Sequence, residues 1–425
     1  MIAVLTVLLG ESCTSHEVMD DHVIVCQKQQ VGISLQMAVN SVASRKITSW
    51  DSAQQVNDMR LYLFRCPEAD GKEGTYTYYV PQNLADNSQG YYAVGSFDNQ
   101  KPYLSTEHNG QFEEHTFFFT PILETGYYYK FLAVGRDDKY SDEQHLANPT
   151  FTANTTTWED ASISLSTSTI NSAKNGNPLN TTELFVGKLQ ENDQTTGAED
   201  ALLVTDETME FNRSITLRRA VAGLMFYVVN IPSLVEDNTT TDGNRTIFKP
   251  TSLTLEATAL GTDEYLASKT ATTTTPMQYQ IVANIDLTAA NGWSIDEAKQ
   301  IFTRPADEEK EWKENSYMTT NFMMPTLETS MKVGKDATSK AGSQKVTFYF
   351  HYTDGTHHHY DNVKLITDDG GKLVFPIEAN HLYTIGEKNK TNNTPYDLKK
   401  FYPAMVDITL EIEPSFDKRH DFDVE

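Results

Sequence analysis

Short stretches in which apolar and polar residues alternate recur along most of this chain. Residues 31–42 are a clear example, because Val31, Ile33, Leu35 and Met37 occupy alternate positions. A period of two residues is typical of a β-strand that buries one face. Comparable runs, separated by turn residues at roughly the spacing found in β-sandwiches, occupy residues 59–64, 75–80, 91–94, 116–119, 127–134, 163–165 and 184–187.

A second series of strand-like runs follows an acidic, glycine-containing stretch at residues 191–201. Within this series, residues 345–365 predict a hairpin, because an alternating run ends at Asp354 and Gly355, a dipeptide typical of type I′ turns. The other runs are residues 214–222, 224–229, 253–257, 280–284, 374–377, 381–385 and 405–412. We therefore expect an all-β protein.

One short helix is predicted within the second series. Ser294 and Glu297 have the spacing of a capping box, which predicts a helix that begins there and runs to about Phe302. Three segments rich in Thr, Asn and Ser are interpreted as long solvated loops or exposed edge strands: residues 148–173, 237–246 and 268–276.

The length of the chain and the acidic stretch together predict its division into domains. A domain averages about 150 residues, so 425 residues allow two or three domains. We place a boundary after the acidic stretch, with an N-terminal β-sandwich domain at residues 31–205 and a C-terminal one at 206–425. Residues 14–30 are polar and mixed in charge, as expected of a flexible tether. Residues 1–13 form a separate apolar leader.

The composition narrows the range of partners. With 59 acidic and 34 basic residues the formal net charge is −25, and this surface would repel the phosphates of nucleic acid. The three cysteines, Cys13, Cys26 and Cys66, do not form a disulfide framework. Beyond residue 13 no apolar run is long enough for a membrane helix.

The leader resembles the signal of a bacterial lipoprotein. A short apolar run is followed at once by Glu11, Ser12 and Cys13. Such a run is too short to span a bilayer but has the length of a secretory signal core. In lipoproteins of this type the signal is removed and the cysteine carries the lipid, so Cys13 is the predicted lipidation site. The alternative is a buried first strand in which Cys13 is an ordinary residue.

The order of the segments resembles the fimbrillin superfamily of Bacteroidales, and most closely its fimbrial anchor and accessory lipoproteins. The resemblance rests on the leader that ends at Cys13 and on three further motifs: residues 56–64 (VNDMRLYLF), residues 215–222 (ITLRRAVA) and residues 375–385 (FPIEANHLYTI). The run of one glycine and three tyrosines at residues 126–129 also fits a strand of the family.

The resemblance implies two tandem transthyretin-like Greek-key β-sandwiches with long loops, the short helix lying in the second. It also implies assembly with other fimbrial subunits by strand exchange, in which a neighbour donates a strand to an incomplete sandwich. An exposed sheet edge offers unpaired backbone groups to such a strand. Residues 31–42 are the candidate for the movable strand. Residues 406–425 could also pair with a neighbour, although the charged residues 418–421 predict a solvated tail.

Proteolytic processing is a further implication of the resemblance. Arg45 matches the position after which an arginine-specific protease cuts polymerising relatives, so that a cleaved chain would start at Lys46. In anchor subunits this cut is not required and the lipidated N-terminus stays attached. The alternative is that Arg45 is an exposed turn residue.

The implied function is that of a non-enzymatic fimbrial (pilus) subunit, an anchor or an accessory or tip lipoprotein. It would carry palmitate at the cell outer membrane and contribute to cell adhesion, with a host or bacterial surface ligand as a further partner. The alternative is a glycan-binding surface lipoprotein of a polysaccharide-uptake system. Tyrosines at residues 76–79 and 127–129 could stack on sugars, although alternating aromatic residues in strands are more typical of a core.

Candidate catalytic and metal-binding residues are few. In a two-residue hairpin at Asp354 and Gly355, His351 would share one sheet face with His358, whereas His357 and His359 would lie on the other. Two histidines per face, with no cysteine or clear carboxylate nearby, form an incomplete metal site. We therefore predict no metal and no cofactor. The acidic residues 137–143 lack the ligand pattern of a calcium loop, and no catalytic motif is present.

Overall fold

The computed structural model describes a set of segments distributed over the whole chain. These are residues 28–30, 32–37, 58–80, 92–93, 116–119, 122–136, 146–147, 151–179, 181–182, 184–189, 201–205, 212–240, 246–260, 263–265, 277–325, 346–365, 377, 379, 381–388, 392–398 and 418–424.

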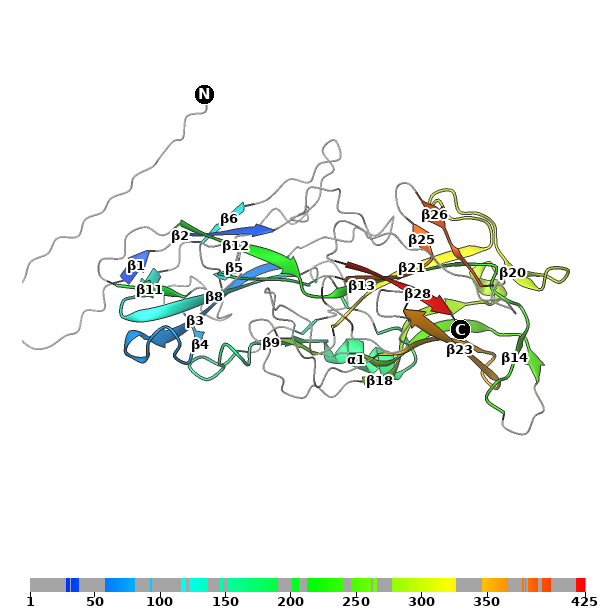
Figure 1. Cartoon of the computed structure of the whole chain (residues 1–425), viewed down its shortest axis with the longest axis horizontal. Coiled ribbons are helices and arrows are strands. Elements are labelled where there is room, and N and C mark those ends of the chain that lie inside the picture. The colour runs from blue at the N-terminus through cyan, green and yellow to red at the C-terminus, as the bar shows by residue number, and fades with distance from the viewer. Residues whose placement is uncertain are drawn as a thin grey trace, which may run out of the picture.

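Two nine-stranded sheets dominate the described part of the molecule, which is elongated with one sheet toward each end (Figure 1). The first sheet has the order β4-β3-β8-β10-β12-β2-β6, with β11 added to β8 and β5 to β3. Its strands are β2 (Gly32–Met37), β3 (Asp58–Pro67), β4 (Thr77–Tyr79), β5 (Tyr92–Ala93), β6 (Thr116–Phe119), β8 (Tyr127–Arg136), β10 (Leu184–Lys188), β11 (Leu202–Val204) and β12 (Asn212–Arg219).

The second sheet has the order β18-β16-β22-β23-β28-β24-β13-β21, with β27 added to β13. Its strands are β13 (Ala222–Val229), β16 (Ser252–Leu260), β18 (Met277–Asp286), β21 (Ser316–Met323), β22 (Phe348–Thr353), β23 (His358–Leu365), β24 (His381–Ile385), β27 (Tyr396–Asp397) and β28 (Lys418–Val424).

Smaller elements surround the two sheets. Two-stranded ladders join β1 (Lys28–Gln30) to β7 (Ile122–Glu124), β9 (Ser162–Ser164) to β17 (Asp263–Tyr265), β14 (Val235–Glu236) to β15 (Ile247–Phe248), β19 (Ser294–Asp296) to β20 (Ile301–Thr303), and β25 (Glu387–Lys388) to β26 (Asn393–Thr394). The helical elements are α1 (Thr167–Lys174) and two 3₁₀ turns, η1 (Glu68–Asp70) and η2 (Ala289–Asn291).

The first sheet is buried on both faces at its centre. Tyr62 and Phe64 of β3 point to one face, where they contact Phe151 at ring-centroid distances of 4.9 and 5.7 Å. Leu61 and Leu63 alternate with them, so they lie on the opposite face, and they are 0 and 1% exposed. Burial on both sides explains why this strand has a continuous apolar run rather than a strict alternation.

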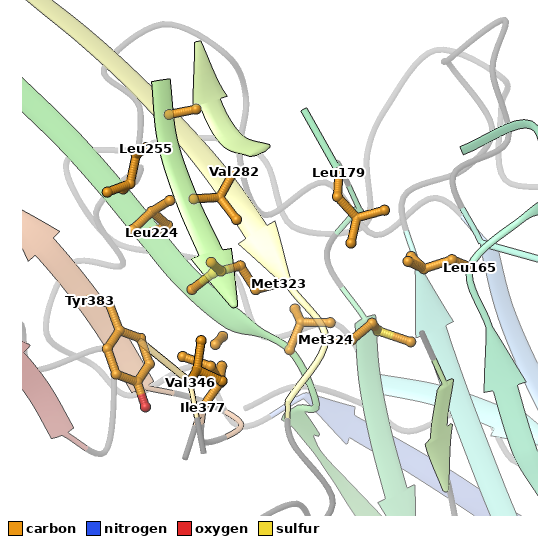
Figure 2. Packing of buried hydrophobic residues seen from close by; sticks show 14 of the residues in the cluster. Leu165, Leu179, Leu224, Leu255, Val282, Met323, Met324, Val346, Ile377 and Tyr383 are labelled. Atoms are coloured by element: carbon orange, nitrogen blue, oxygen red, sulfur yellow. The ribbon is translucent and has the colours of Figure 1, made fainter. Parts of the chain in front are cut away.

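The second sheet folds over so that its two halves face each other. Phe226 of β13 and Phe350 of β22 meet at 5.6 Å between ring centroids, although these strands lie far apart in the strand order. Figure 2 shows the same core from nearby, with Leu224, Leu255 and Val282 directed toward one another. The all-β sandwich fold expected from the sequence is thereby confirmed.

The helix predicted from Ser294 to Phe302 is wrong, because this segment forms the β19–β20 hairpin. Asp296 Oδ1 accepts hydrogen bonds from the N–H groups of Ala298 and Lys299, which closes a turn instead of a helix. The returning strand is then held from outside, since the N–H of Phe302 donates to the carbonyl of Ile231. The long-range hydrogen bond between Phe302 and Ile231 overrides the local capping signal.

The observed helix, α1, lies in a segment that was expected to be loop or edge strand. Ser166 caps it by accepting a hydrogen bond from the N–H of Thr169 at 3.2 Å. In the hairpin at residues 345–365, β22 and β23 pair as predicted, but Thr353 pairs with His358. The connecting loop therefore has four residues instead of two.

Two observations bear on the predicted division of the chain. Residues 28–30, the end of the predicted tether, form β1 and pair with β7. Strand β12 belongs to the first sheet, whereas β13 belongs to the second, so the chain changes sheets at Ala220 and Val221. The boundaries at residues 30 and 205 stay predictions.

Candidate functional site

The strand predicted to be movable lies inside the first sheet. β2 runs parallel to β12, with its six residues Gly32–Met37 aligned with residues 212–217. On its other side it runs antiparallel to β6, from the pair Ile33 with Phe119 to the pair Gln36 with Thr116. An N-terminal segment is thus inserted between two strands that follow it at long distances along the chain.

β12 depends on β2 for most of its ladder on that side of the sheet. Its other neighbour, β10, pairs with it only at Arg218 and Arg219. Among the described strands, β2 is therefore the ladder partner of residues 212–217 and the link between β12 and β6. Without β2, six residues of β12 would present unpaired backbone groups, which is the kind of edge that accepts an added strand.

The register places β2 over a buried face. Leu35 is aligned with Ile215, which is 0% exposed. Aligned residue pairs connect β12 to β10, β10 to β8 and β8 to β3. Because aligned residues share a sheet face, Ile215 lies on the same face as Phe131 and Leu61, which are both 0% exposed. In the backbone register, positions 33, 35 and 37 of β2 are aligned with positions 213, 215 and 217 of β12, so the apolar positions of the sequence match the strand positions that include Ile215.

The strand that precedes β2 pairs with a strand whose last residue, Glu124, is held by an ion pair. β1 pairs with β7, and Lys28 is aligned with Glu124. The Glu124 carboxylate binds Arg65 Nη1 at 2.6 Å, and the Arg65 guanidinium lies 3.9 Å from the centre of the Tyr79 ring. Burial works against the charge of Arg65, but Glu124 outweighs it, so the pKa of Arg65 is raised. Release of the N-terminal segment would therefore break three ladders, β1 with β7, β2 with β12 and β2 with β6.

The last strand of the chain is also inserted between two others. β28 runs parallel to β24, with Lys418 aligned with His381 and Asp421 with Thr384. It runs antiparallel to β23 at residues 363–365. The prediction of a solvated tail at residues 418–421 is wrong. Charge describes the side chains, whereas β28 is held by backbone pairing with strands on both sides.

The residues predicted for lipidation and processing, Cys13, Arg45 and Lys46, lie outside the described residues, as do the acidic residues 137–143. Among the described helices none is long and apolar enough to cross a membrane. The structure thus places the candidate movable strand but not the chemistry expected around it.

Each histidine of the β22–β23 hairpin has a side-chain hydrogen-bond partner. His351 and His358 share one sheet face as predicted, with His351 Nε2 2.9 Å from His358 Nδ1. A carboxylate, not expected from the sequence, is also present, since Glu256 Oε1 lies 2.6 Å from His351 Nδ1. Burial opposes the charge of Glu256, but hydrogen bonds from His351 and Thr254 outweigh it and lower the pKa of Glu256.

The other two histidines have different surroundings. His357 lies in the loop, where its backbone N–H and its ring bind Asp354 and lower the pKa of Asp354 to about 2. His359 is buried on the inner face, with Nε2 3.0 Å from Asp361 Oδ1. The described residues contain no group of three or more His, Cys, Asp or Glu side chains that could hold a metal ion.

The tyrosines considered for sugar stacking are largely part of the core. Tyr76, Tyr78, Tyr79 and Tyr129 are between 0 and 6% exposed. Tyr78 contacts the Phe64 ring at 5.7 Å, and Tyr79 contacts Tyr129 at 5.9 Å. These four side chains therefore offer no exposed platform for a sugar ring.

Comparison with known proteins identifies the family. Residues 47–418 match the family model of the fimbrillin-A associated anchor proteins Mfa1 and Mfa2. Because the match covers most of the chain, the protein belongs to this family, and its role is of the fimbrial anchor or adhesin type. A search of curated protein sequences found no match.

The chain is also similar to solved structures that are distant from it in sequence. The chain is similar to the fimbrial anchor protein Mfa2 from Porphyromonas gingivalis, at 8% identity and a TM-score of 0.35, over 83% of this chain and 100% of that one. It is also similar to a fimbrial assembly protein from Parabacteroides distasonis, at 11% identity and a TM-score of 0.33, over 86% of this chain and 93% of the other.

Proposed function

We propose that this protein is a non-enzymatic anchor or accessory subunit of a fimbrium, held at the outer membrane by a lipid on Cys13. It joins other fimbrial subunits by strand complementation and contributes to adhesion at the cell surface. Membership of the anchor family supports the fimbrial role. The observation that supports strand complementation is the insertion of β2 between β12 and β6.

The physical basis of the proposed assembly is the equivalence of backbone ladders. Any extended strand that supplies N–H and C=O groups in register can replace β2 beside residues 212–217. The alternate positions aligned with Ile215 and its neighbours then require apolar side chains on the incoming strand, because that face is buried. Backbone pairing supplies the affinity and the apolar positions supply the register.

The anchor role depends on which N-terminus the mature protein carries. A chain that starts at lipidated Cys13 keeps β2 connected to the membrane. A chain cleaved after Arg45 starts at Lys46 and has lost the covalent connection to β2. We favour the anchor, because the lipidation signal lies close to the first strand.

Mass spectrometry of the protein isolated from cell envelopes tests this proposal. We expect an N-terminus at Cys13 carrying acyl chains, with loss of membrane attachment in Cys13→Ser and retention in the matched control Cys26→Ser. An N-terminus at residue 46, abolished in Arg45→Gln but retained in Lys46→Gln, would instead indicate a stalk or tip subunit. Any other N-terminus would contradict both versions.

A further inference from the structure

A segment from the first half of the chain closes the second sheet. This bridging segment comprises residues 151–179 and 181–182. Along the chain it lies between β8 and β10, which both belong to the first sheet. At its start it packs against the first sheet, where Trp158 meets Phe64 at 5.2 Å between ring centroids. At its end it reaches the two outermost strands of the second sheet, β18 and β21.

Leu179 and Thr181 lie between those two strands. The N–H of Leu179 donates to the carbonyl of Ile281 in β18 at 2.7 Å. On the other side, Thr181 forms an antiparallel bridge with Phe322 of β21. Leu179 and Thr181 are 4 and 7% exposed, so this contact is interior. Leu179 thus pairs with β18 at one position and Thr181 with β21 at another, as a short strand inserted between them would.

Asn321 links the three chain segments. It lies in β21, is 8% exposed, and donates through Nδ2 to the carbonyl of Leu179 at 3.0 Å and to the carbonyl of Val282 at 3.1 Å. A buried amide that donates to two carbonyls is costly to remove, because both acceptors were desolvated on folding. One side chain therefore connects β21, β18 and the bridging segment.

Apolar packing continues across the same place. Leu165 and Leu179 of the bridging segment belong to one buried core with Val282, Met323 and Met324 of the second half of the chain. Figure 2 shows Met324 between the side chains of the second sheet and Leu165 and Leu179. A second ladder, between β9 and β17, joins the bridging segment to the second half independently.

These contacts make the second sheet incomplete without the first half of the chain. We propose that the bridging segment is an internal clasp, which makes the two sheets unfold, and bear load, as one unit. A tensile load applied between the two ends then has to break the ladders and the shared core together. This inference concerns the folded monomer and depends on neither lipid attachment nor strand exchange.

The substitution Asn321→Asp tests the clasp in the full-length chain. It keeps the size of the side chain but places carboxylate oxygen where two carbonyl oxygens need a donor. Asn284→Asp is the matched control, because Asn284 lies on β18 and is exposed. Hydrogen–deuterium exchange through a urea titration would follow residues 127–136 for the first sheet and residues 277–286 for the second.

In the unmodified chain and in N284D, we expect both segments to lose protection at one common midpoint. In N321D the midpoint of residues 277–286 should fall by about 1 M urea, while that of residues 127–136 changes less, so that the two separate. If N321D does not fold, Leu179→Ala, which removes packing but leaves the backbone bonds, should separate the midpoints in the same direction. Separate midpoints in the unmodified chain, or a common midpoint that persists in the folded variants, would overturn the proposal.

Discussion

The two sheets each contain a strand from one end of the chain, but the strands occupy different places. β2 lies next to the margin of the first sheet, with only β6 beyond it. β28 lies in the middle of the second sheet, with four strands on the side of β23 and, counting β27, four on the side of β24. Loss of β2 would trim a margin, whereas loss of β28 would cut a sheet in two.

The number of ladder positions does not parallel this difference. β2 is aligned with six residues of β12 and four of β6. β28 is aligned with three residues of β23 and four of β24. The strand with the longer ladder is thus the one whose absence detaches only β6 and leaves the other seven strands of its sheet joined. Position in the sheet, more than the count of backbone bonds, decides which strand is suited to exchange.

The largest effect is expected from loss of β28. Truncation after residue 417 removes the only described ladder between β23 and β24. With a net contribution of about 1 kcal/mol per backbone hydrogen bond, the free energy of unfolding should fall by roughly 5 kcal/mol. Urea unfolding of the truncated chain measures this loss. Replacement of residues 418–424 by a Gly/Ser sequence of equal length keeps the backbone N–H and C=O groups, so it should be less destabilising than truncation, and removal of Glu425 alone should have no effect.

A smaller loss of stability is expected when β2 is removed, together with a new binding activity. A chain that starts at residue 47 should stay folded in its second sheet and should bind a synthetic peptide of residues 28–40 added in trans. The same peptide with Leu35→Pro should bind at least tenfold more weakly, because proline cannot donate to a central ladder. Fluorescence anisotropy of the labelled peptides measures both. Equal binding of the two peptides, or destabilisation as large as that caused by loss of β28, would contradict the contrast between the two strands.

The stability of the second sheet should also depend on pH, through His359 of β23. Burial works against the charge of His359, but Asp361 at Nε2 and the Glu236 carbonyl at Nδ1 outweigh it and raise the pKa of His359. Because the pKa of His359 is higher in the folded than in the unfolded state, its protonation stabilises the fold. This contribution is complete below about pH 6.5, the unfolded pKa, and is lost as the pH rises through the pKa of the folded state.

The variant His359→Gln cannot become charged and should remove this dependence. We expect a loss on the order of 1 kcal/mol relative to the unmodified chain at pH 5.5, and a smaller difference at pH 9. Urea unfolding at a series of pH values measures the difference. His357→Gln, in the adjoining loop, is the control and should leave the pH dependence of the unmodified chain in place. A difference that grows with pH would show that the sign is wrong.

Much of the strand pattern could be predicted from alternation alone. Residues 116–119 and 381–385 are strands with the predicted bounds, and the run at 31–42 contains β2. These strands have an apolar face of their own, so the local sequence carries the signal. The partners of β2 could not be predicted, because register depends on β12 and β6, which come from distant parts of the chain.

The elements that sequence reasoning missed are specified by their surroundings. β28 reads as a charged tail, and only the edges of β23 and β24 make it a strand. Leu179 and Thr181 lie in a polar, loop-like stretch, and their burial depends on β18 and β21. One signal was available for this contact: Asn321 is an amide in an apolar run, and a buried amide requires partners.

The smallest effect expected here comes from two buried hydroxyl groups, one at the clasp and one beside β28. Among the described residues, neither Thr181 Oγ1 nor Thr384 Oγ1 has a hydrogen-bond partner, and the two residues are 7 and 1% exposed. Substitution by Val exchanges an unsatisfied hydroxyl for a methyl group of similar size, which should raise the free energy of unfolding by about 1 kcal/mol at each site.

The pair of variants compares the two regions directly. Thr384 lies in β24, next to β28, so Thr384→Val should slow exchange in both sheets if they unfold as one unit. Thr181 lies in the bridging segment, so Thr181→Val should slow exchange in residues 127–136 and 277–286 alike if the clasp couples the sheets. Hydrogen–deuterium exchange of the two variants under one condition measures both. If Thr181→Val protects only residues 277–286, the bridging segment stabilises the second sheet alone and does not couple the two sheets.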